Sequence, residues 1–268
     1  MHQYWFFIGS FPVRAYSTLF LLAFLLGIGV SVFLAKVEGK RHLVDHLLNL
    51  APILFIGGLI GSRFWQVFFF DWQYYSVHPG QIIAIWNGGL SIQGGIVGSL
   101  IAGIIYVRIK HLSFWELADL MAPGLILGQS IGRDANLMNG DAFGSPTGGH
   151  FGLLYPQDTL AYATYGNKPL WPAEVWEGQG DVIIFALLLI IKQWRIPRGW
   201  LFLIEMILYN LERFLLEILR GDSPRFLFHW DAAQWTSIPV IVIALALLPL
   251  LARMDKKRKQ DEATMASS

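Results

Sequence analysis

The segment GRDANLMNGDAFG, residues 132–144, places many polar side chains directly behind an apolar run. Arg133, Asn136, Asn139 and Asp141 supply a guanidinium, two amides and a carboxylate at close spacing. A guanidinium can grip a phosphate or carboxylate with two parallel hydrogen bonds, amides donate and accept, and a carboxylate can take a proton. This segment therefore carries candidates for both anion binding and proton transfer.

A second group of such residues lies in YNLERFLLEILRGDS, residues 209–223. Arg213, Glu217 and Arg220 stand at positions i, i+4 and i+7, which predicts that all three share one helical face. One carboxylate between two guanidiniums predicts a net positive cleft. An ion-pair staple between helices is the alternative for this triplet, and the further arginine at position 133 favours an anion site instead.

The elements that must position these residues are membrane helices. Of 268 residues, 54% are hydrophobic and 15% are charged, and the mean hydropathy is +0.48. This composition indicates an all-α, polytopic membrane protein. We expect one integral-membrane domain over residues 1–252 and a basic, disordered tail over 253–268. The absence of cysteine excludes disulfides, thiolate metal sites and a cysteine nucleophile on this chain.

Runs of roughly 20 apolar residues predict seven spans. They cover about residues 16–35, 48–70, 81–107, 117–131, 175–191, 200–219 and 237–251. The third is overlong and rich in glycine, and the fourth is short unless the polar segment at 132–144 continues it. The positive charges of the first span mostly follow its apolar run, so we interpret it as a retained helix rather than a cleaved signal peptide.

The distribution of basic residues predicts the orientation. Of the 20 lysines and arginines, 13 follow spans one, three, five and seven. By the positive-inside rule that side is cytoplasmic. The carboxyl terminus is then cytoplasmic, whereas the amino terminus and a loop over about residues 134–171 face outward.

Four arginines fall inside or at the end of a predicted span: Arg63, Arg133, Arg213 and Arg220. An arginine at the centre of a bilayer costs about 2.5 to 3.5 kcal/mol, so each needs a partner or a water-filled cavity. Several guanidiniums near the outer membrane surface suit a lipid phosphate, because the acyl chains can stay in hydrocarbon while arginine binds the headgroup.

The glycines are compatible with a cavity. Gly124, Gly128 and Gly132 keep a four-residue spacing that is typical of close helix packing. In WNGGLSIQGGIVG, residues 86–98, polar Ser91 and Gln93 stand between two glycine pairs, which favours a break or re-entrant turn lining a cavity. There is no HExxH motif. We expect no metal site, no cofactor and no nucleic-acid partner.

The order of these motifs resembles the bacterial prolipoprotein diacylglyceryl transferase family. The likeness runs from FPVRAYSTLFLLAFLLG through GSRFWQVFFF, GRDANLMNGDAFG and RFLLEILRGDSP to AQWTSIP. The resemblance implies a seven-span enzyme of the bacterial cytoplasmic (inner) membrane that catalyses the first step of lipoprotein maturation. It would move diacylglyceryl from phosphatidylglycerol to the lipobox cysteine of a preprolipoprotein signal peptide, forming a thioether and releasing glycerol phosphate at the outer leaflet.

The resemblance also assigns roles to residues. Arg133, Asn136 and Asp141 would be catalytic, with Arg213 and Glu217 on span six. The further catalytic candidates are Tyr16 and Gln93, and the phosphatidylglycerol-binding candidates are Arg133, Asn139, Arg213, Arg220, Gly94 and Gly95. The arginines would neutralise charge on the departing phosphate. A base must take the thiol proton, or the positive cavity must favour the thiolate.

The sequence departs from the family pattern at Gln93, where a histidine is usual. Glutamine cannot act as a base near neutral pH. Trp171 and Trp176 replace polar positions of another motif, and Asp134 follows the signature arginine in place of an apolar residue. These changes are compatible with an enzyme for which the histidine is dispensable or with a divergent paralogue that uses another acceptor. We expect an active enzyme in which Asp141 or Glu217 accepts the proton or stabilises the thiolate.

A non-catalytic lipid or solute transporter is the competing class, and a membrane scaffold is a third. Transporters often contain repeated halves with paired broken segments. Here the two unusual segments are neighbours, spans three and four, and we find no second copy in the sequence. The transferase reading is therefore favoured.

Overall fold

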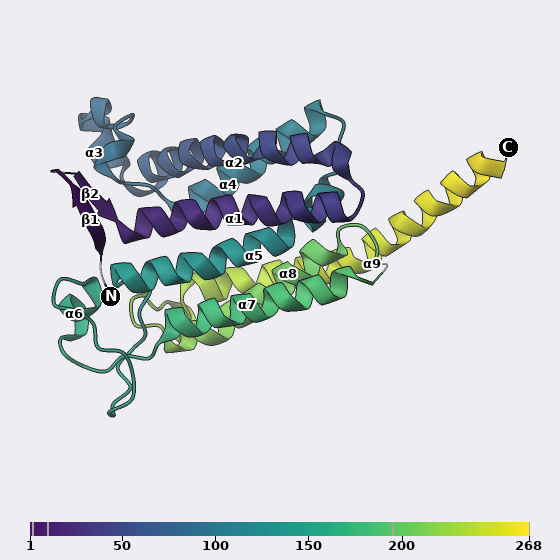
Figure 1. The fold of residues 1–268 in the computed structure, drawn as a ribbon. Helices are drawn as coiled ribbons and strands as arrows, with labels where there is room; N and C mark the ends of the chain where they lie inside the picture. The colour runs from purple at the N-terminus through teal and green to yellow at the C-terminus, as the bar shows by residue number, and fades with distance from the viewer. Residues whose placement is uncertain (2, 10, 195, 268) are drawn as a thin grey trace. The chain divides into compact units, whose positions relative to one another are not determined.

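The computed structural model describes residues 1, 3–9, 11–194 and 196–267, and these are mostly helical (Figure 1). A short antiparallel hairpin at the amino terminus comes first, formed by β1 (Tyr4–Ile8) and β2 (Phe11–Arg14). The long helices are α1 (Ala15–Val37), α2 (Val44–Trp65), α4 (Ile92–Ile109), α5 (Phe114–Asn139), α7 (Ala173–Lys192), α8 (Trp200–Leu216) and α9 (Ala232–Ser267). Two short helices, α3 (Trp72–Val77) and α6 (Leu160–Tyr165), lie in the connections. The all-α prediction is confirmed.

Among the described residues, four helical segments are long and apolar enough to cross a membrane: Ala15–Val37, Arg41–Phe70, Ile92–Ile109 and Ala232–Asp261. The helices α5, α7 and α8 are long as well, but each carries charged side chains within its length. A membrane helix tolerates such side chains when they face other helices. The seven-span topology stays a prediction.

The predicted start of the third span is wrong. The helix begins at Ile92, because residues 72–91 form short helices and turns in which Gly88 and Gly89 have φ angles of +82° and +71°. The polar segment continues the fourth span, which was one of the two outcomes expected from the sequence, because α5 runs through residues 132–139 to Asn139. The loop that is predicted to face outward therefore begins near Gly140 and not near residue 134. For the residues before Ile92, the glycine pairs in 86–98 were the sequence feature that predicted a break.

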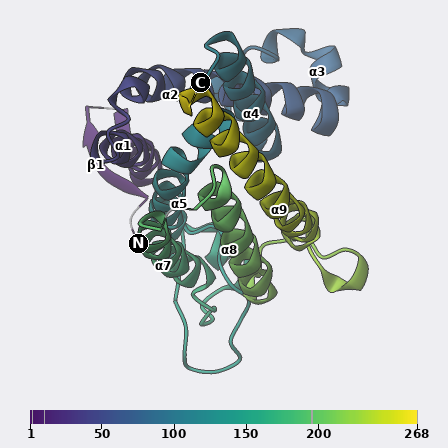
Figure 2. The same cartoon turned by 90° about the vertical axis from the view of Figure 1, so that its right-hand side faces the viewer.

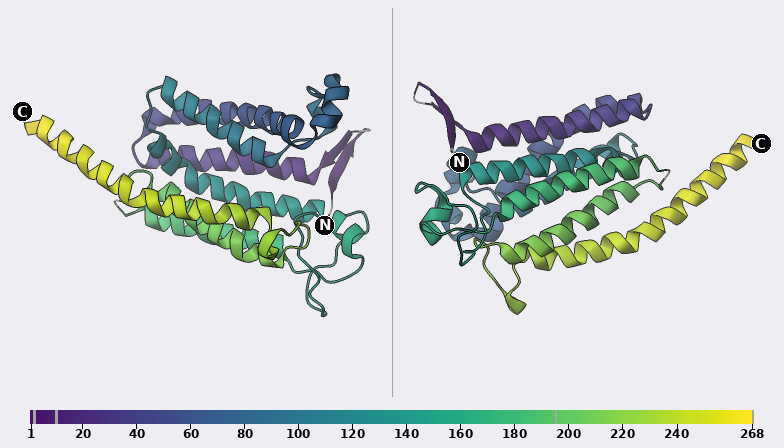
Figure 3. Two further views of the ribbon diagram at one scale, coloured as in Figure 1. Left: turned by 180° about the vertical axis from the view of Figure 1, so that it is seen from behind. Right: turned by 60° about the horizontal axis from the view of Figure 1, so that its bottom comes forward.

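The prediction of a disordered tail is also wrong for the described residues, because α9 continues as a helix to Ser267 (Figures 1 and 3). Ion pairs between side chains of α9 stabilise this part of the helix. Asp255 pairs with Arg258 at 2.6 Å and with Lys259 at 2.7 Å, at the i, i+3 and i, i+4 spacings that stabilise helices. The integral-membrane domain over 1–252 stays a prediction.

The chain divides into two compact units, and the first comprises Met1–Ser31 and Ala118–Ser268. Within it α8 lies between α7 and α9 (Figure 2). Its apolar core is formed by Ile126, Ile184, Leu188 and Leu201. Gly27 of α1 lies against Gly124 of α5 so closely that a Cβ at either position would meet the other backbone. The predicted close packing of α5 is thus present at Gly124, whereas a Cβ at Gly132 would meet nothing within 4 Å.

The second unit, Val32–Leu117, is built around α2 and α4. Their backbones approach through a glycine seam made of Gly57, Gly58, Gly61, Gly94 and Gly98. Arg63, near the end of α2, is buried beneath the turns that connect the two helices. Its guanidinium donates to the carbonyls of Ile82 (2.9 Å), Gly88 (2.6 Å), Gly89 (2.7 Å), Ala84 (3.2 Å) and Gln81. Arg63 thus supplies hydrogen-bond donors to the carbonyl groups of the turns and attaches the turns to α2.

Candidate active site

The polar segment 132–144 forms the end of a helix and the turn that follows it. Gly140 has a φ of +74°, and its N–H donates to the carbonyl of Asn136 at 2.8 Å, which ends α5. The side chains of Asn136 and Asn139 then both reach Asp141. Asn136 Nδ2 donates to Asp141 Oδ1 and Asn139 Nδ2 to Asp141 Oδ2, each at 2.6 Å. Two amides therefore hold one carboxylate at the end of the helix.

Arg133 lies one turn earlier on α5 and faces α7. The helices approach closely there because position 178 is glycine, where an added Cβ would stand 3.2 Å from the Cβ of Arg133. Ser130 Oγ also donates to the carbonyl of Gly178 at 2.9 Å. Arg133 Nη2 consequently reaches Glu177 Oε1 of α7 at 2.6 Å. The side chain of Glu177 is 1% exposed and that of Arg133 is 16% exposed, so the carboxylate of this ion pair is out of solvent.

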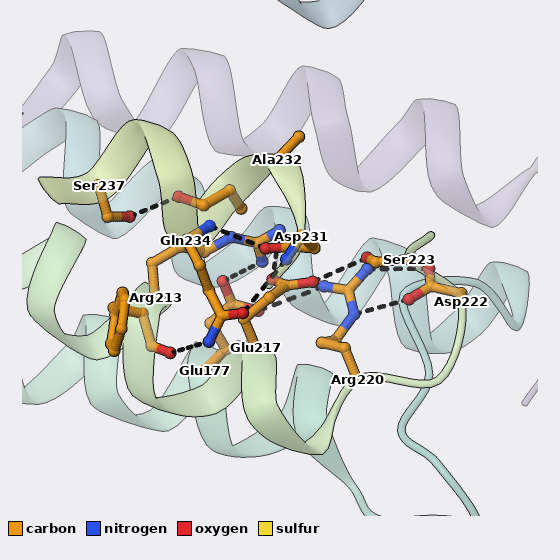
Figure 4. Close-up of polar contacts among 12 residues, drawn as sticks. Glu177, Arg213, Glu217, Arg220, Asp222, Ser223, Asp231, Ala232, Gln234 and Ser237 are labelled. Carbon is orange, nitrogen blue, oxygen red and sulfur yellow. Dashed lines mark hydrogen bonds and ion pairs between the residues drawn. The ribbon is translucent and has the colours of Figure 1, made fainter. Parts of the chain in front are cut away.

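Arg213 of α8 binds the same carboxylate from another side. Its Nη1 lies 2.6 Å from Glu177 Oε1, and its Nη2 lies 2.8 Å from Glu217 Oε2 (Figure 4). The predicted i, i+4 pair of Arg213 and Glu217 is thus present. Ser223 Oγ donates to the other oxygen of Glu217 at 2.7 Å. One guanidinium therefore joins two buried carboxylates from different helices.

The prediction that Arg220 shares this helical face is wrong. α8 ends at Leu216, a turn of 3-10 helix follows, and Arg220 is extended with a ψ of 142°. Its Nε and Nη2 form a two-pronged pair with Asp222, both at 2.8 Å (Figure 4). Its Nη1 still points to the cluster and lies 3.7 Å from Glu177 Oε2.

A net positive cleft was also expected, and the structure contradicts it. Three arginines meet three carboxylates, and they are Arg133, Arg213, Arg220, Glu177, Glu217 and Asp222. Glu217 is the carboxylate that stands between Arg213 and Arg220 in the sequence, whereas Glu177 comes from another helix. A buried ion pair is costly to break on one side only, so this cluster favours exchange of one anion for another.

The acidic face of α7 is the part of the site that sequence reasoning missed. Glu174, Glu177 and Asp181 stand at i, i+3 and i+7 and are all buried. Carboxylates inside an apolar span are a functional signal that was available in the sequence. Glu174 accepts a hydrogen bond from the hydroxyl of Tyr155 in the loop. Burial, together with the Glu174 carboxylate, raises the pKa of Tyr155 far above its ordinary value, so this hydroxyl stays a donor.

Tyr16 and Gln93 stand in different units. Tyr16 of α1 is exposed and lies within electrostatic reach of Asp141 and Arg133, so it belongs to the surroundings of the cluster. Gln93 of the second unit is exposed, and its Oε1 accepts a hydrogen bond from Ser91 Oγ at 2.8 Å. Its role in catalysis stays a prediction.

The close approach of α2 accounts for both glycines of the predicted substrate contact. A Cβ at Gly94 would meet the Gly61 carbonyl, and one at Gly95 would stand 2.7 Å from Ser62 Oγ. Contact of Gly94 and Gly95 with phosphatidylglycerol stays a prediction.

The two tryptophans that depart from the family pattern lie together. Trp171 and Trp176 pack at 5.7 Å between ring centroids, and Phe151 joins them, so these tryptophans form an aromatic cluster beside Glu177.

Arg225 lies beyond the end of α8. Its Nη2 donates to the carbonyls of Glu217 (2.9 Å) and Arg220 (3.0 Å), so it caps the end of the helix that carries Arg213.

The family model described as prolipoprotein diacylglyceryl transferase matches residues 3–250. A protein of Bacillus licheniformis is 37% identical over 245 residues, which cover 90% of this chain and 89% of the relative. A Nostoc protein is 37% identical over 251 residues, covering 91% and 87%, and one of Listeria monocytogenes is 34% identical over 245 residues, covering 90% and 86%. All three relatives carry the name phosphatidylglycerol--prolipoprotein diacylglyceryl transferase.

Proposed function

The chain belongs to the prolipoprotein diacylglyceryl transferase family, and from this we infer that it is a transferase that moves diacylglyceryl from phosphatidylglycerol to a prolipoprotein. In finer detail, we propose that the acceptor is the thiol of a lipobox cysteine in the signal peptide. The chain contains no cysteine of its own, so the thiol must come with the acceptor.

One observation supports the placing of the phosphate. Arg133 and Arg213 both end on a single oxygen of Glu177, and Arg220 points to the other oxygen. Guanidiniums that converge on a carboxylate also match the oxygens of a phosphate diester. The headgroup phosphate would take over the contacts that Arg133 and Arg213 now make with Glu177.

The reaction is a substitution at the glycerol carbon that bears the phosphate. The sulfur forms a bond to this carbon, the carbon–oxygen bond breaks, and its electron pair goes to the phosphate oxygen as glycerol phosphate leaves. Charge therefore grows on the leaving phosphate in the transition state. Arg133 and Arg213 stabilise that charge, which is the term that usually dominates catalysis of this type.

The thiol proton needs an acceptor, and we assign this role to Asp141. In the described part of the chain, only the neutral amides of Asn136 and Asn139 donate to its carboxylate. Glu217, in contrast, pairs with Arg213 and accepts from Ser223. Asp141 can take a proton without breaking an ion pair. Tyr16, which lies within electrostatic reach of Asp141, would orient the thiol.

The test is a transfer assay with the purified full-length chain in phosphatidylglycerol vesicles carrying a labelled diacylglyceryl group. A lipobox peptide should acquire the label through a thioether, and glycerol phosphate should appear in equal amount. A matched peptide with serine in place of the cysteine should acquire none. Consumption of phosphatidylglycerol with no label on the lipobox peptide would indicate a paralogue with another acceptor. This is the second candidate function, because the sequence departs from the family pattern at Gln93, Trp171 and Trp176.

The chain is a membrane protein, and we further propose that it lies in the bacterial inner membrane with the cluster near the outer leaflet and the end of α9 in the cytoplasm. The basic residues that follow alternate spans support this orientation. Single cysteines introduced at Gly149 and at Lys257 should react with an impermeant thiol reagent from opposite sides, Gly149 from outside. Labelling of both from one side would refute it.

A further inference from the structure

Three carboxyl groups near the arginine cluster have buried oxygens without a hydrogen-bond partner among the described residues. Both carboxyl oxygens of Asp181 and Glu205, and one oxygen of Glu212, are buried and have no hydrogen-bond partner among the described residues. Asp181 and Glu205 are each 0% exposed. Asp181 is on α7, and the two glutamates are on α8. These acids take no part in the substitution chemistry proposed above.

The three acids are neighbours of one another and of the cluster. Asp181 stands one turn after Glu177 on α7, and its charge would interact with those of Arg133, Arg213 and Glu212. Glu205 in turn would feel a charge on Asp181. Gly180 makes room for Glu212, because a Cβ at Gly180 would meet its carboxylate. The acids therefore form one group that extends from Glu177 into the bundle.

Among the described residues, no hydrogen bond reaches the oxygens of Asp181 and Glu205 or the buried oxygen of Glu212. Tyr209 of α8 is a further titratable group within electrostatic reach of Asp181. The buried Oε1 of Gln129 on α5 is itself without a partner among the described residues. Ile184 stands one turn after Asp181 on α7 and Leu201 one turn before Glu205 on α8, and both belong to the apolar core with Ile126. An anion without a partner in such a place would cost several kcal/mol or more, so Asp181 and Glu205 are stable here only with their protons. Glu212 is partly exposed, and the nearby charges of Asp181 and Glu177 favour its protonated form.

We propose that Asp181, Glu205 and Glu212 hold protons at neutral pH and act as positioning residues that leave Arg133 and Arg213 free to exchange Glu177 for the headgroup phosphate. An ionised Asp181 would give Arg133 a second permanent anion and would repel the phosphate. With neutral acids behind it, Glu177 is the anion that Arg133 and Arg213 share, and the incoming phosphate competes with that one group. This inference rests on the phosphate assignment made above.

The charge state of these acids then controls headgroup affinity. Raising the pH removes protons from the group and adds negative charge behind the guanidiniums. We expect the dissociation constant of a short-chain phosphatidylglycerol to rise about tenfold between neutral and alkaline pH, because one added charge is close to the site. Asp181→Asn, Glu205→Gln and Glu212→Gln fix neutral side chains of the same shape, so each should reduce this rise.

The experiment uses the full chain in detergent micelles and two measurements. Infrared difference spectra between neutral and alkaline pH should show loss of a protonated-carboxyl band in the native protein, and a smaller loss in each variant. Calorimetric binding of dihexanoyl phosphatidylglycerol at the same two pH values gives the ratio of dissociation constants for each protein. Asp158→Asn, an exposed acid in the loop, is the matched control and should keep the native ratio and the native band.

Absence of the protonated-carboxyl band in the native protein would overturn the proposal, as would a native pH ratio in all three variants or a headgroup that does not bind. If Asp181→Asn fails to fold, Glu205→Gln and Glu212→Gln still test the same effect. Neither measurement needs diacylglyceryl transfer. A chain that binds the headgroup with the expected pH ratio and transfers nothing would therefore refute the proposed reaction and leave this inference standing.

Discussion

Two buried arginine sites in this protein differ in the groups that partner the guanidinium. In the second unit, Arg63 donates to backbone carbonyls of the turns between α2 and α4. In the first unit, Arg133 and Arg213 bind carboxylates, and both contact Glu177. Each site satisfies the need for a partner inside a membrane protein.

The difference between the sites lies in the kind of partner. The position of a backbone carbonyl is fixed by the fold. Arg63 donates to five such carbonyls, so its role is to stabilise the turns that contain them. A side-chain carboxylate can rotate away or be exchanged for another anion. Burial of an arginine is therefore weak evidence for catalysis, and the chemical nature of its partner is stronger evidence.

The largest effect is expected at the exchangeable site. Arg133→Lys and Arg213→Lys should each lower the rate of transfer to a lipobox peptide about 100-fold or more, because an ammonium keeps the charge but loses the planar fork. The rate is measured with labelled phosphatidylglycerol at saturating peptide. Arg108→Lys, exposed at the end of α4, is the matched control and should transfer at the native rate. Native rates in both cluster variants would remove the phosphate assignment.

The opposite pattern is expected at Arg63. Arg63→Lys leaves several carbonyls of the turns without a donor, and each buried unsatisfied group costs about 1 to 3 kcal/mol. The melting temperature in detergent should fall clearly, while the transfer rate per folded molecule should stay near the native value. A variant with the native melting temperature and a strongly reduced transfer rate would show that Arg63 is catalytic, and the two arginine sites would then not differ in role.

A smaller effect is expected from the glycine that brings α7 to Arg133. A Cβ at Gly178 would stand 3.2 Å from Arg133 Cβ, so Gly178→Ala should shift the guanidinium by a few tenths of an ångström. We expect the transfer rate to fall about tenfold, because misplacement of a catalytic group by about an ångström can cost 100-fold. Gly61→Ala, in the seam between α2 and α4, should instead lower the melting temperature. Similar losses of transfer rate in Gly178→Ala and Gly61→Ala would contradict the assignment of Gly178 to positioning Arg133 and of Gly61 to helix packing.

The smallest effect is expected at Gln93. Its side chain is exposed and bonds to Ser91, and the proposed proton acceptor is Asp141. Gln93→His should therefore change the transfer rate by less than about threefold between roughly pH 6 and 9, well below what a general base contributes. An inactive native protein that gains transfer with histidine would show that the base is misassigned.

The interior of α5 shows where sequence reasoning was sufficient. Hydropathy, helix periodicity and the left-handed glycine are local properties, so the helix, its polar end and the need of Arg133 for a partner follow from the residues alone. The start of α4 was placed too early for the opposite reason: residues 81–91 are apolar enough for a span, and the contacts with Arg63 that hold them in turns are not local.

The sequence by itself determined the fold class, the apolar segments that form the helices, and the need of each buried arginine for a partner. Only the tertiary structure decided which partner each arginine has. Helical periodicity shows which side chains share a face, but it says nothing about the helix that will lie opposite. Glu177 reaches Arg133 and Arg213 because α7 packs on α5 and α8 through small residues, and this contact between helices turned an expected positive cleft into a balanced cluster.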